Sequence, residues 1–273
     1  MHREGRETSM FIAIDIGNTH TVIGIYNKDT CIADCRLKRT QQRKVTEVFA
    51  HVRSLLTTNG IHKEKINGIG ISSVVPKLTA IYAEMAKKYF HQEPMIVSAE
   101  LNLGIKIHYD NPKSLGADRI CNAIAGYSKY GGPLIVIDFG TATTYDVIGS
   151  NGDYLGGVIA PGIGTSAIAL HKRTAKLPRL VGGELHLPES IIGTNTMSSM
   201  QAGILWGAID AMTGMVKRIQ TELLRHQSKK VIVIATGGFS TFVAERTRII
   251  QHVEPTLVLD GIWLIYKRVK SIT

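Results

Sequence analysis

The sequence predicts an α/β protein built from two similar domains, each with a mixed sheet and helices on its faces. Three observations carry this prediction. The chain has 273 residues, which is enough for two modest domains. The segment 11–19 (FIAIDIGNT) aligns with 134–142 (LIVIDFGTA), so that an apolar strand ends twice in Asp-x-Gly. After each of these strands the patterns follow the same order, which reads βββαβαβα.

The first repeat covers residues 10–132, after a polar extension of residues 1–9 that is left out of the predicted fold. Apolar residues at spacings of three and four predict its first helix, and β-branched runs predict its strands. Gly131, Gly132 and Pro133 stop the last helix of the repeat, so we place the domain boundary at residue 132. The expected elements are a meander of three strands from Met10 to Arg39, a helix over 45–56, a strand at 69–75, a helix, a strand at 95–98 and a final helix.

The second repeat covers residues 133–273 and is expected to repeat this order. A second meander follows the strand that begins at Leu134, and a long helical pattern runs over 200–224. An inner strand is expected at 231–238, and a last short strand at 256–261 (TLVLDG). Two domains of this kind place the ligand in the cleft between them.

Both strand ends have the composition of a phosphate-binding turn. Gly17 lets the backbone approach an anion closely, and the turn presents several N–H groups. Asn18, Thr19 and Thr21 add polar side chains, while the Asp15 carboxylate is suited to hold Mg²⁺ through water. The second copy repeats this pattern, in the segment 138–143 (DFGTAT). Two such turns would hold a polyphosphate from both sides.

A third glycine-containing segment, 236–238 (TGG), would let a flat base such as adenine lie against the backbone. Taken alone, it reads equally well as a strand-to-helix turn, and a single Asp-x-Gly motif more often marks an ordinary turn. Two copies at equivalent positions favour nucleotide binding. Neither GxxxxGK[ST] nor a GxGxxG after a strand is present, so the common nucleotide loops are excluded.

The composition excludes other classes of protein. With 44% hydrophobic and 20% charged residues, the chain is neither disordered nor fibrous. No run approaches the roughly 20 apolar residues of a membrane span, and the N-terminus lacks a secretory signal pattern. We therefore expect a cytoplasmic protein with no membrane partner. The net charge of +10 fits anionic ligands rather than nucleic acid, because the basic run 36–44 has no interleaved aromatics.

On these motifs the sequence resembles the superfamily of acetate and sugar kinases, heat-shock 70 proteins and actin, whose members have duplicated actin-like, ribonuclease H-like domains around an ATP cleft. Within it, the sequence resembles type III pantothenate kinases over residues 10–273. That resemblance implies transfer of the ATP γ-phosphoryl group to the primary hydroxyl of pantothenate, the first step of coenzyme A synthesis. The segments that carry it are AIDIGNTHTVIG, Tyr109 with Asn111-Pro112, Gly116-Ala117-Asp118-Arg119, IDFGTATT, Gly193-Thr194-Asn195-Thr196 and ATGG.

The resemblance also implies roles for individual residues. Asp118 is expected to be the general base, although an isolated Gly-Ala-Asp-Arg string more often contains a helix N-cap. The residues implied to bind pantothenate are Tyr109, Gly116, Ala117, Asp118, Arg119 and Thr196. The residues expected to bind ATP are Asp15, Ile16, Gly17, Asn18, Thr19, His20, Thr21, Val22, Thr141, Gly237 and Gly238, and among these the resemblance itself implies the contact of Thr141. For His20, a partly exposed turn histidine without a phosphate contact is the alternative.

Two cations are expected besides ATP. Asp15 is assigned to Mg²⁺, and the resemblance assigns Asp138 to a monovalent cation, K⁺ or NH₄⁺. The repeat alone leaves Asp138 open as a second Mg²⁺ carboxylate, because it mirrors Asp15. The resemblance further implies a homodimer, and the apolar run 204–219 would either fill the core or bury a partner helix.

Two other functions are kept as alternatives. An ATP-binding, actin-like regulatory or accessory protein would retain Asp15, Asp138 and the TGG segment without pantothenate turnover. It would have no use for the pair formed by Asp118 and Arg119. A sugar or acetate kinase would share the chemistry and use another acceptor.

Overall fold

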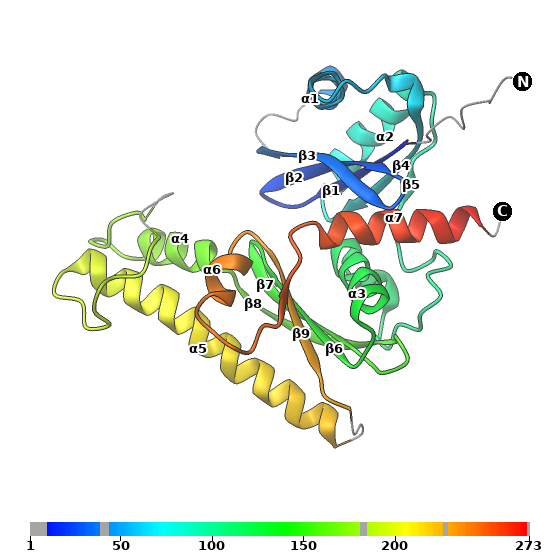
Figure 1. Ribbon diagram of the computed structural model, residues 1–273. Coiled ribbons are helices and arrows are strands. Elements are labelled where there is room, and N and C mark those ends of the chain that lie inside the picture. Colours follow the sequence, from blue (N-terminus) through cyan, green and yellow to red (C-terminus); the bar gives the residue numbers. More distant parts are fainter. Residues whose placement is uncertain (1–9, 39–43, 181–184, 226–228, 272–273) are drawn as a thin grey trace, which may run out of the picture. The chain divides into compact units, whose positions relative to one another are not determined.

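The computed structural model describes residues 10–38, 44–180, 185–225 and 229–271 (Figure 1). Contacts within the chain divide it into two units. The first unit comprises Met1–Ala125 and Thr256–Thr273, and the second comprises Gly126–Pro255. None of the helices in the described part of the chain combines the length and apolar character that crossing a bilayer requires.

The first unit contains a five-stranded sheet in the order β3-β2-β1-β4-β5. Strands β1 to β3 form an antiparallel meander, β4 pairs parallel to β1, and β5 pairs parallel to β4. The bounds are β1 (Met10–Ile16), β2 (His20–Asn27), β3 (Thr30–Lys38), β4 (Ile66–Ser73) and β5 (Met95–Ile96). Short 3₁₀ helices lie at Lys63–Lys65 and Pro112–Ser114.

Strand β1 is buried on both faces, and its alternation determines where Asp15 lies. Ile12, Ile14 and Ile16 point into the core that contains α1 (Val45–Thr58) and α2 (Pro76–Phe90). The opposite face of the same sheet is covered by α7 (Leu257–Lys270), whose Leu259 and Ile262 pack close to glycines of β2 and β4. Side chains alternate along a strand, so Asp15 shares this second face, at the strand's carboxyl end.

The second unit repeats the topology, with the sheet order β10-β9-β6-β7-β8. Strands β6 to β8 form the antiparallel meander, and β9 and β10 pair parallel to β6 and β9, respectively. The bounds are β6 (Leu134–Phe139), β7 (Ala142–Ile148), β8 (Tyr154–Pro161), β9 (Ile232–Gly237) and β10 (His252–Val253). The helices are α4 (Ile163–Arg173), α5 (Thr196–Leu224) and α6 (Ser240–Ala244).

Helix α3 (Ala117–Tyr130) links the two units, because the division falls between Ala125 and Gly126. Its first turns therefore belong to the first unit and its last turn to the second. This division differs from the boundary expected at residue 132. It also assigns α7, the last helix of the second repeat, to the first unit.

The duplicated α/β fold is confirmed, since both sheets have the same strand order. One predicted strand is wrong. The segment TLVLDG, expected as a strand at 256–261, forms the first turns of α7, and the last strand lies earlier, at His252–Val253. Leu257, Gly261, Ile262 and Ile265 are buried at helical spacing, which explains the difference. Helix α4 is a further element that the expected order did not contain.

Candidate active site

The Asp15 carboxylate is half-buried at the end of β1 and is held by a neighbouring strand. Ser72 of β4 is paired with Asp15 in the parallel register, so the two side chains lie on the same face. The Ser72 hydroxyl donates a hydrogen bond to Asp15 Oδ1 at 2.9 Å. A carboxylate at this position is a suitable ligand for a hard cation such as Mg²⁺.

The turn after β1 presents backbone and small polar groups. The Gly17 N–H donates to the His20 carbonyl at 2.9 Å, which closes a turn that leaves Asn18 and Thr19 exposed. Val22 is half-buried and is paired with Asp15 across the β1–β2 ladder, so it shares the face on which Asp15 lies.

Two residues expected to bind ATP have their side chains on the other face. Ile16 and Thr21 are fully buried, and Thr21 forms a side-chain hydrogen bond with the buried Tyr82 of α2. Burial raises the pKa of the Tyr82 hydroxyl well above its ordinary value. Ile16 and Thr21 therefore offer a ligand only backbone groups, and their side chains anchor the turn to the core.

His20 lies at the start of β2 beside two basic residues of β3. The guanidinium of Arg36 is 3.3 Å from His20 Nδ1. Because a guanidinium only donates, this ring nitrogen accepts, and Nε2 carries the proton. Partial burial, followed by the charges of Arg36 and Lys38, lowers the pKa of His20. The imidazole is therefore neutral at physiological pH.

The start of α3 carries the expected base. Burial raises the pKa of the Asp118 carboxyl above its ordinary value, while the Arg119 backbone N–H and the Arg119 charge oppose this shift. That N–H donates to Asp118 Oδ1 at 2.8 Å, and the Arg119 side chain is itself buried. A Cβ on Gly116 would stand 2.4 Å from Asp118 Oδ1, so glycine leaves room for the carboxylate. Ala117 is buried at the first position of the helix.

Tyr109 is half-buried in the loop that precedes α3. This loop is ordered by the Asn111 side chain, which accepts a hydrogen bond from the Lys113 backbone N–H at 3.2 Å and begins the short 3₁₀ helix. Tyr109 and the Gly116–Arg119 segment lie in the first unit, which also contains Asp15.

In the second unit, the turn after β6 is shorter than the turn after β1, and hydrogen bonds attach it to the start of α4. The Gly140 N–H donates to the Ala142 carbonyl at 3.0 Å, and Thr141 is exposed at the tip. The Thr141 carbonyl accepts hydrogen bonds from the Gly162 N–H at 3.2 Å and from the Thr165 hydroxyl at 2.5 Å. These bonds attach the turn to the first turn of α4.

Asp138 is half-buried, and its carboxylate is packed against a glycine. Gly237 ends β9 with φ of +86°, and a Cβ there would stand 2.4 Å from Asp138 Oδ1. The Ser240 hydroxyl donates to the Gly237 carbonyl at 2.7 Å and fixes this turn, while Gly238 is exposed. Only glycine satisfies both the positive φ and the close approach at position 237.

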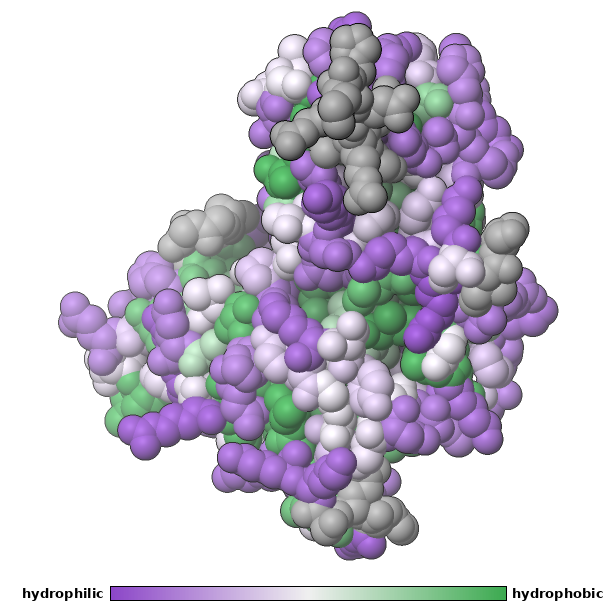
Figure 2. All heavy atoms as spheres, turned by 45° about the vertical axis from the view of Figure 1, so that its right-hand side comes forward, coloured by the Kyte–Doolittle hydropathy of each residue, from purple (hydrophilic) through white to green (hydrophobic). Residues whose placement is uncertain are grey.

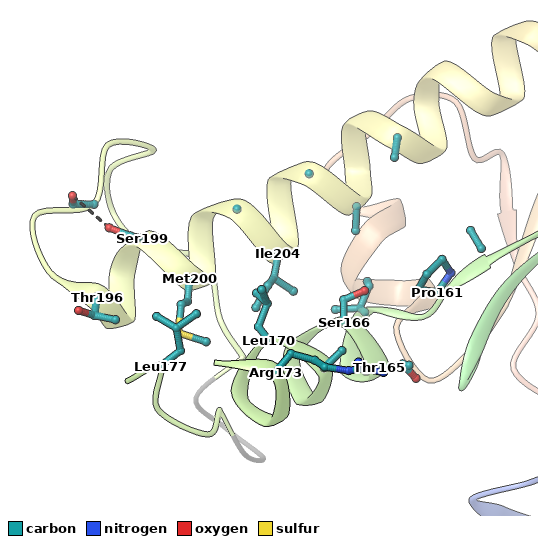
Figure 3. A pocket seen from close by; sticks show the side chains of 18 of the residues that line it. Pro161, Thr165, Ser166, Leu170, Arg173, Leu177, Thr196, Ser199, Met200 and Ile204 are labelled. Carbon is teal, nitrogen blue, oxygen red and sulfur yellow. Dashed lines mark hydrogen bonds between the residues drawn. The ribbon is translucent and has the colours of Figure 1, made fainter. Parts of the chain in front are cut away.

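Thr196 is exposed at the first position of α5, after the N-cap Asn195, whose side chain accepts from the Ser198 N–H at 2.9 Å. It lines an apolar groove of about 1300 Å³ between α4 and the first half of α5. Figure 3 shows Leu170 and Arg173 of α4 opposite Ile204 of α5, with Thr196 at one end. The run 204–219 was expected either to fill the core or to bury a partner helix, and its buried residues are Ile204, Leu205, Ile209, Met212 and Val216.

The carboxylates of Asp15 and Asp138 are suited to cations that bind together with phosphate. Among the described residues, no group of three or more His, Cys, Asp or Glu side chains forms a cage for a metal. Mg²⁺ usually binds through one or two carboxylates together with substrate phosphates and water. Single carboxylates such as Asp15 and Asp138 meet this requirement.

The family model for type III pantothenate kinase matches residues 11–218, which is more than half of the chain. The chain belongs to the type III pantothenate kinase family. Its sequence is 44% identical over 259 residues to a type III pantothenate kinase of Halalkalibacterium halodurans, covering 95% of this chain and 99% of that protein. The predicted family is thereby confirmed.

Solved structures support the fold of this pantothenate kinase family member. A conserved Baf family chain of Campylobacter jejuni has a TM-score of 0.58 at 20% identity, covering 95% of this chain and 99% of that one. A propionate kinase of Francisella tularensis has a TM-score of 0.53 at 11% identity, with 93% and 98% covered. At these identities the likeness shows the actin-like fold alone.

Sequence reasoning did not identify three residues that form hydrogen bonds with candidate site residues: Ser72 with Asp15, and Gly162 and Thr165 with Thr141. Ser72 is separated from Asp15 by 57 positions, and only strand pairing shows that they meet. For Gly162 and Thr165, the one available signal was the Pro-Gly pair that ends β8 and begins α4.

Proposed function

We propose that this protein is an ATP-dependent pantothenate kinase that transfers the γ-phosphoryl group of ATP to the primary hydroxyl of pantothenate, giving 4'-phosphopantothenate. Membership of the type III pantothenate kinase family supports the substrate. The structural observation that carries the proposal is the half-buried Asp118 at the start of α3, with a raised pKa and a buried Arg119 beside it. A regulatory ATP-binding protein would not need this pair.

Asp118 acts as the base in this proposal. Its carboxylate accepts a hydrogen bond from the pantothenate hydroxyl, orients the oxygen towards the γ-phosphorus and takes the proton as the new P–O bond forms. The bond between the γ-phosphorus and the bridging oxygen breaks, and ADP leaves with the electron pair. Tyr109, the segment 116–119 and Thr196 are the proposed contacts for pantothenate, with Arg119 suited to an anionic group.

The turns after β1 and β6 offer backbone N–H groups and the side chains of Asn18, Thr19 and Thr141 to phosphate oxygens. Asp15 would hold Mg²⁺ through water, and Mg²⁺ would neutralise phosphate charge when bound. Asp138 is the proposed ligand for K⁺ or NH₄⁺. The ATP cleft between the two domains stays a prediction.

A homodimer and a cytoplasmic location are also part of the proposal. Hydrophilic side chains cover much of the face shown in Figure 2, where hydrophobic ones gather in smaller groups. In the second unit, however, Leu170 lines the groove between α4 and α5 and is 40% exposed, and Ile159 of β8 and Ile168 of α4 are 63% and 41% exposed. Exposed apolar area of this kind favours a subunit contact, and a second copy of the chain is its proposed partner.

The test is ADP release coupled to pantothenate, with Mg²⁺ and K⁺ present. We expect Asp118→Asn to lower kcat by at least about a hundredfold, because general-base catalysis contributes about that much. Its control is Asp34→Asn, the same change at an exposed aspartate of β3, which should keep the wild-type rate. If Asp118→Asn keeps nearly full activity, Asp118 is not the general base. If the wild-type protein shows no pantothenate-dependent ADP release, the proposed function is wrong.

The melting temperature of Asp118→Asn shows whether a loss of activity comes from the missing base or from unfolding of the variant. The folded-state pKa of Asp118 is raised, so its ionised form destabilises the fold above that pKa. Asp118→Asn should therefore unfold at a higher temperature than wild type at neutral pH. A lower melting temperature would show that the carboxylate contributes to folding instead.

A further inference from the structure

A chain of three side chains connects Asp15 to helix α3 inside the first unit. Ser72 donates to Asp15 Oδ1 at 2.9 Å, and the Cys121 thiol forms a side-chain hydrogen bond with Ser72. Ser72 and Cys121 are both 0% exposed. Because Ser72 and Cys121 are shielded from water, the loss of a hydrogen-bond partner there is costly, although the thiol is the weaker donor of the two.

The direction of the hydrogen bonds follows from proton counting. Ser72 has one hydroxyl proton and gives it to the Asp15 carboxylate, so its oxygen accepts the next bond. The Cys121 thiol must then donate. Burial, with the nearby charges of Asp15 and Asp118, raises the pKa of Cys121 well above its ordinary value, so the thiol keeps its proton at neutral pH.

The far end of this chain lies on the helix that carries the proposed base. Cys121 comes three residues after Asp118 in α3, which is about one helical turn. The helix is held in place by α7, since a Cβ on Gly261 would stand 2.3 Å from the Cys121 carbonyl oxygen. A rigid connection therefore runs from Asp15 through β4 to α3.

We propose that Ser72 is a positioning residue that fixes the orientation of the Asp15 carboxylate for metal binding, and that Cys121 holds Ser72 in turn. This inference rests on the proposed function, which assigns Asp15 to Mg²⁺ and ATP. Without the Ser72 hydroxyl, the Asp15 carboxylate can rotate away from the cation. Loss of such an outer partner costs about 10- to 100-fold in metal affinity.

The experiment is calorimetric titration with a non-hydrolysable ATP analogue, with and without Mg²⁺. We expect Ser72→Ala to weaken binding of the Mg²⁺-loaded nucleotide at least about tenfold, while binding of the metal-free nucleotide is unchanged. Ser72→Cys keeps a weak donor at the same place and should lie in between. Cys121→Ser keeps a donor and should behave as wild type, whereas Cys121→Ala should lose part of the Mg²⁺ effect.

Ser73→Ala is the matched control. The Ser73 oxygen accepts from the Val75 N–H at 3.1 Å and from the Thr79 hydroxyl at 2.6 Å, so the change removes hydrogen bonds from a neighbouring serine that does not bond Asp15. It should lower stability without altering the Mg²⁺ dependence. An equal loss of Mg²⁺ dependence in Ser73→Ala, or wild-type Mg²⁺ dependence in Ser72→Ala, would overturn the proposal.

Pantothenate is absent from this titration, so the result does not depend on whether pantothenate is the acceptor. A wild-type protein that binds nucleotide with Mg²⁺ but fails to phosphorylate pantothenate would contradict the proposed function and leave the role of Ser72 supported. Nucleotide binding that is independent of Mg²⁺ in wild type would contradict the role of Ser72.

Discussion

The strand ends that carry Asp15 and Asp138 share one topology and differ in what surrounds the carboxylate. In the parallel register Asp15 faces Ser72, and Asp138 faces Thr236. The next residue of the parallel strand is Ser73 in the first unit and Gly237 in the second. Gly237 has a positive φ and lies against Asp138 Oδ1, so the second carboxylate is packed against a backbone and the first is held by a hydroxyl.

The turns beyond the carboxylates differ as well. Three residues separate β1 from β2, and two separate β6 from β7. The first turn ends on His20, which contacts Arg36, and the second ends on Ala142. Duplication therefore provides the same backbone frame twice, and the residues on neighbouring strands give each carboxylate its own surroundings.

The largest expected effect comes from exchanging each carboxylate for an amide. Asp15→Asn should lower kcat/KM by about a hundredfold, because it removes the charge that holds Mg²⁺ near the transferred phosphoryl group. Asp138→Asn should cost about tenfold, as expected for weaker charge stabilisation by a monovalent cation, and should abolish the response to K⁺. The measurement is steady-state turnover over a range of Mg²⁺ and K⁺ concentrations.

The control for both variants is Asp34→Asn. If Asp138→Asn instead raised the Mg²⁺ requirement and left the K⁺ response intact, Asp138 would be a second Mg²⁺ carboxylate. The two strand ends would then be chemically equivalent in spite of their different neighbours.

A smaller effect on stability is expected from adding one methyl group to each turn. Gly237→Ala should lower the free energy of unfolding by about 2 kcal/mol, since alanine at φ of +86° is strained and its Cβ meets Asp138 Oδ1 at 2.4 Å. Gly17→Ala should cost less than about 1 kcal/mol, because the nearest atom, the His20 carbonyl oxygen, is 3.1 Å away. Urea unfolding measures both, and equal losses would contradict the difference between the turns.

Most of the fold could be predicted because its signals are local. The strands that carry Asp15 and Asp138 are apolar runs that end at a glycine turn, and both were predicted. The first turns of α7 were misread as a strand, because Thr256 to Leu259 alone is rich in apolar and β-branched residues. Its helical pattern becomes clear only when Ile262 and Ile265 are included.

The sequence offers site candidates where one short segment contains the whole signal, as in the segment 116–119. Ser72 and Thr165 could not be found in this way. Ser72 reaches Asp15 through strand pairing, and Thr165 reaches Thr141 through the placement of α4. Such contacts depend on long-range packing, which a linear pattern does not encode. The catalytic and binding roles assigned to the site residues stay predictions.

The smallest expected effect is a pH dependence of the free energy of unfolding, and it arises from His20, the residue that ends the first turn. The pKa of His20 is lowered in the folded protein, so near pH 6.5 the unfolded chain binds more protons than the folded one. The free energy of unfolding should therefore fall as pH falls through that value. His20→Ala places an alanine at the end of the first turn, as Ala142 does at the end of the second. In urea titrations between about pH 7.5 and 5.5, the stability of this variant should fall less steeply than that of wild type. Arg36→Gln should have a similar but smaller effect, because it removes the second cause of the lowered pKa and leaves burial in place. If His20→Ala and wild type lose stability with the same slope, then His20 titrates in the folded protein as it does in the unfolded chain, and the two turns do not differ in this respect.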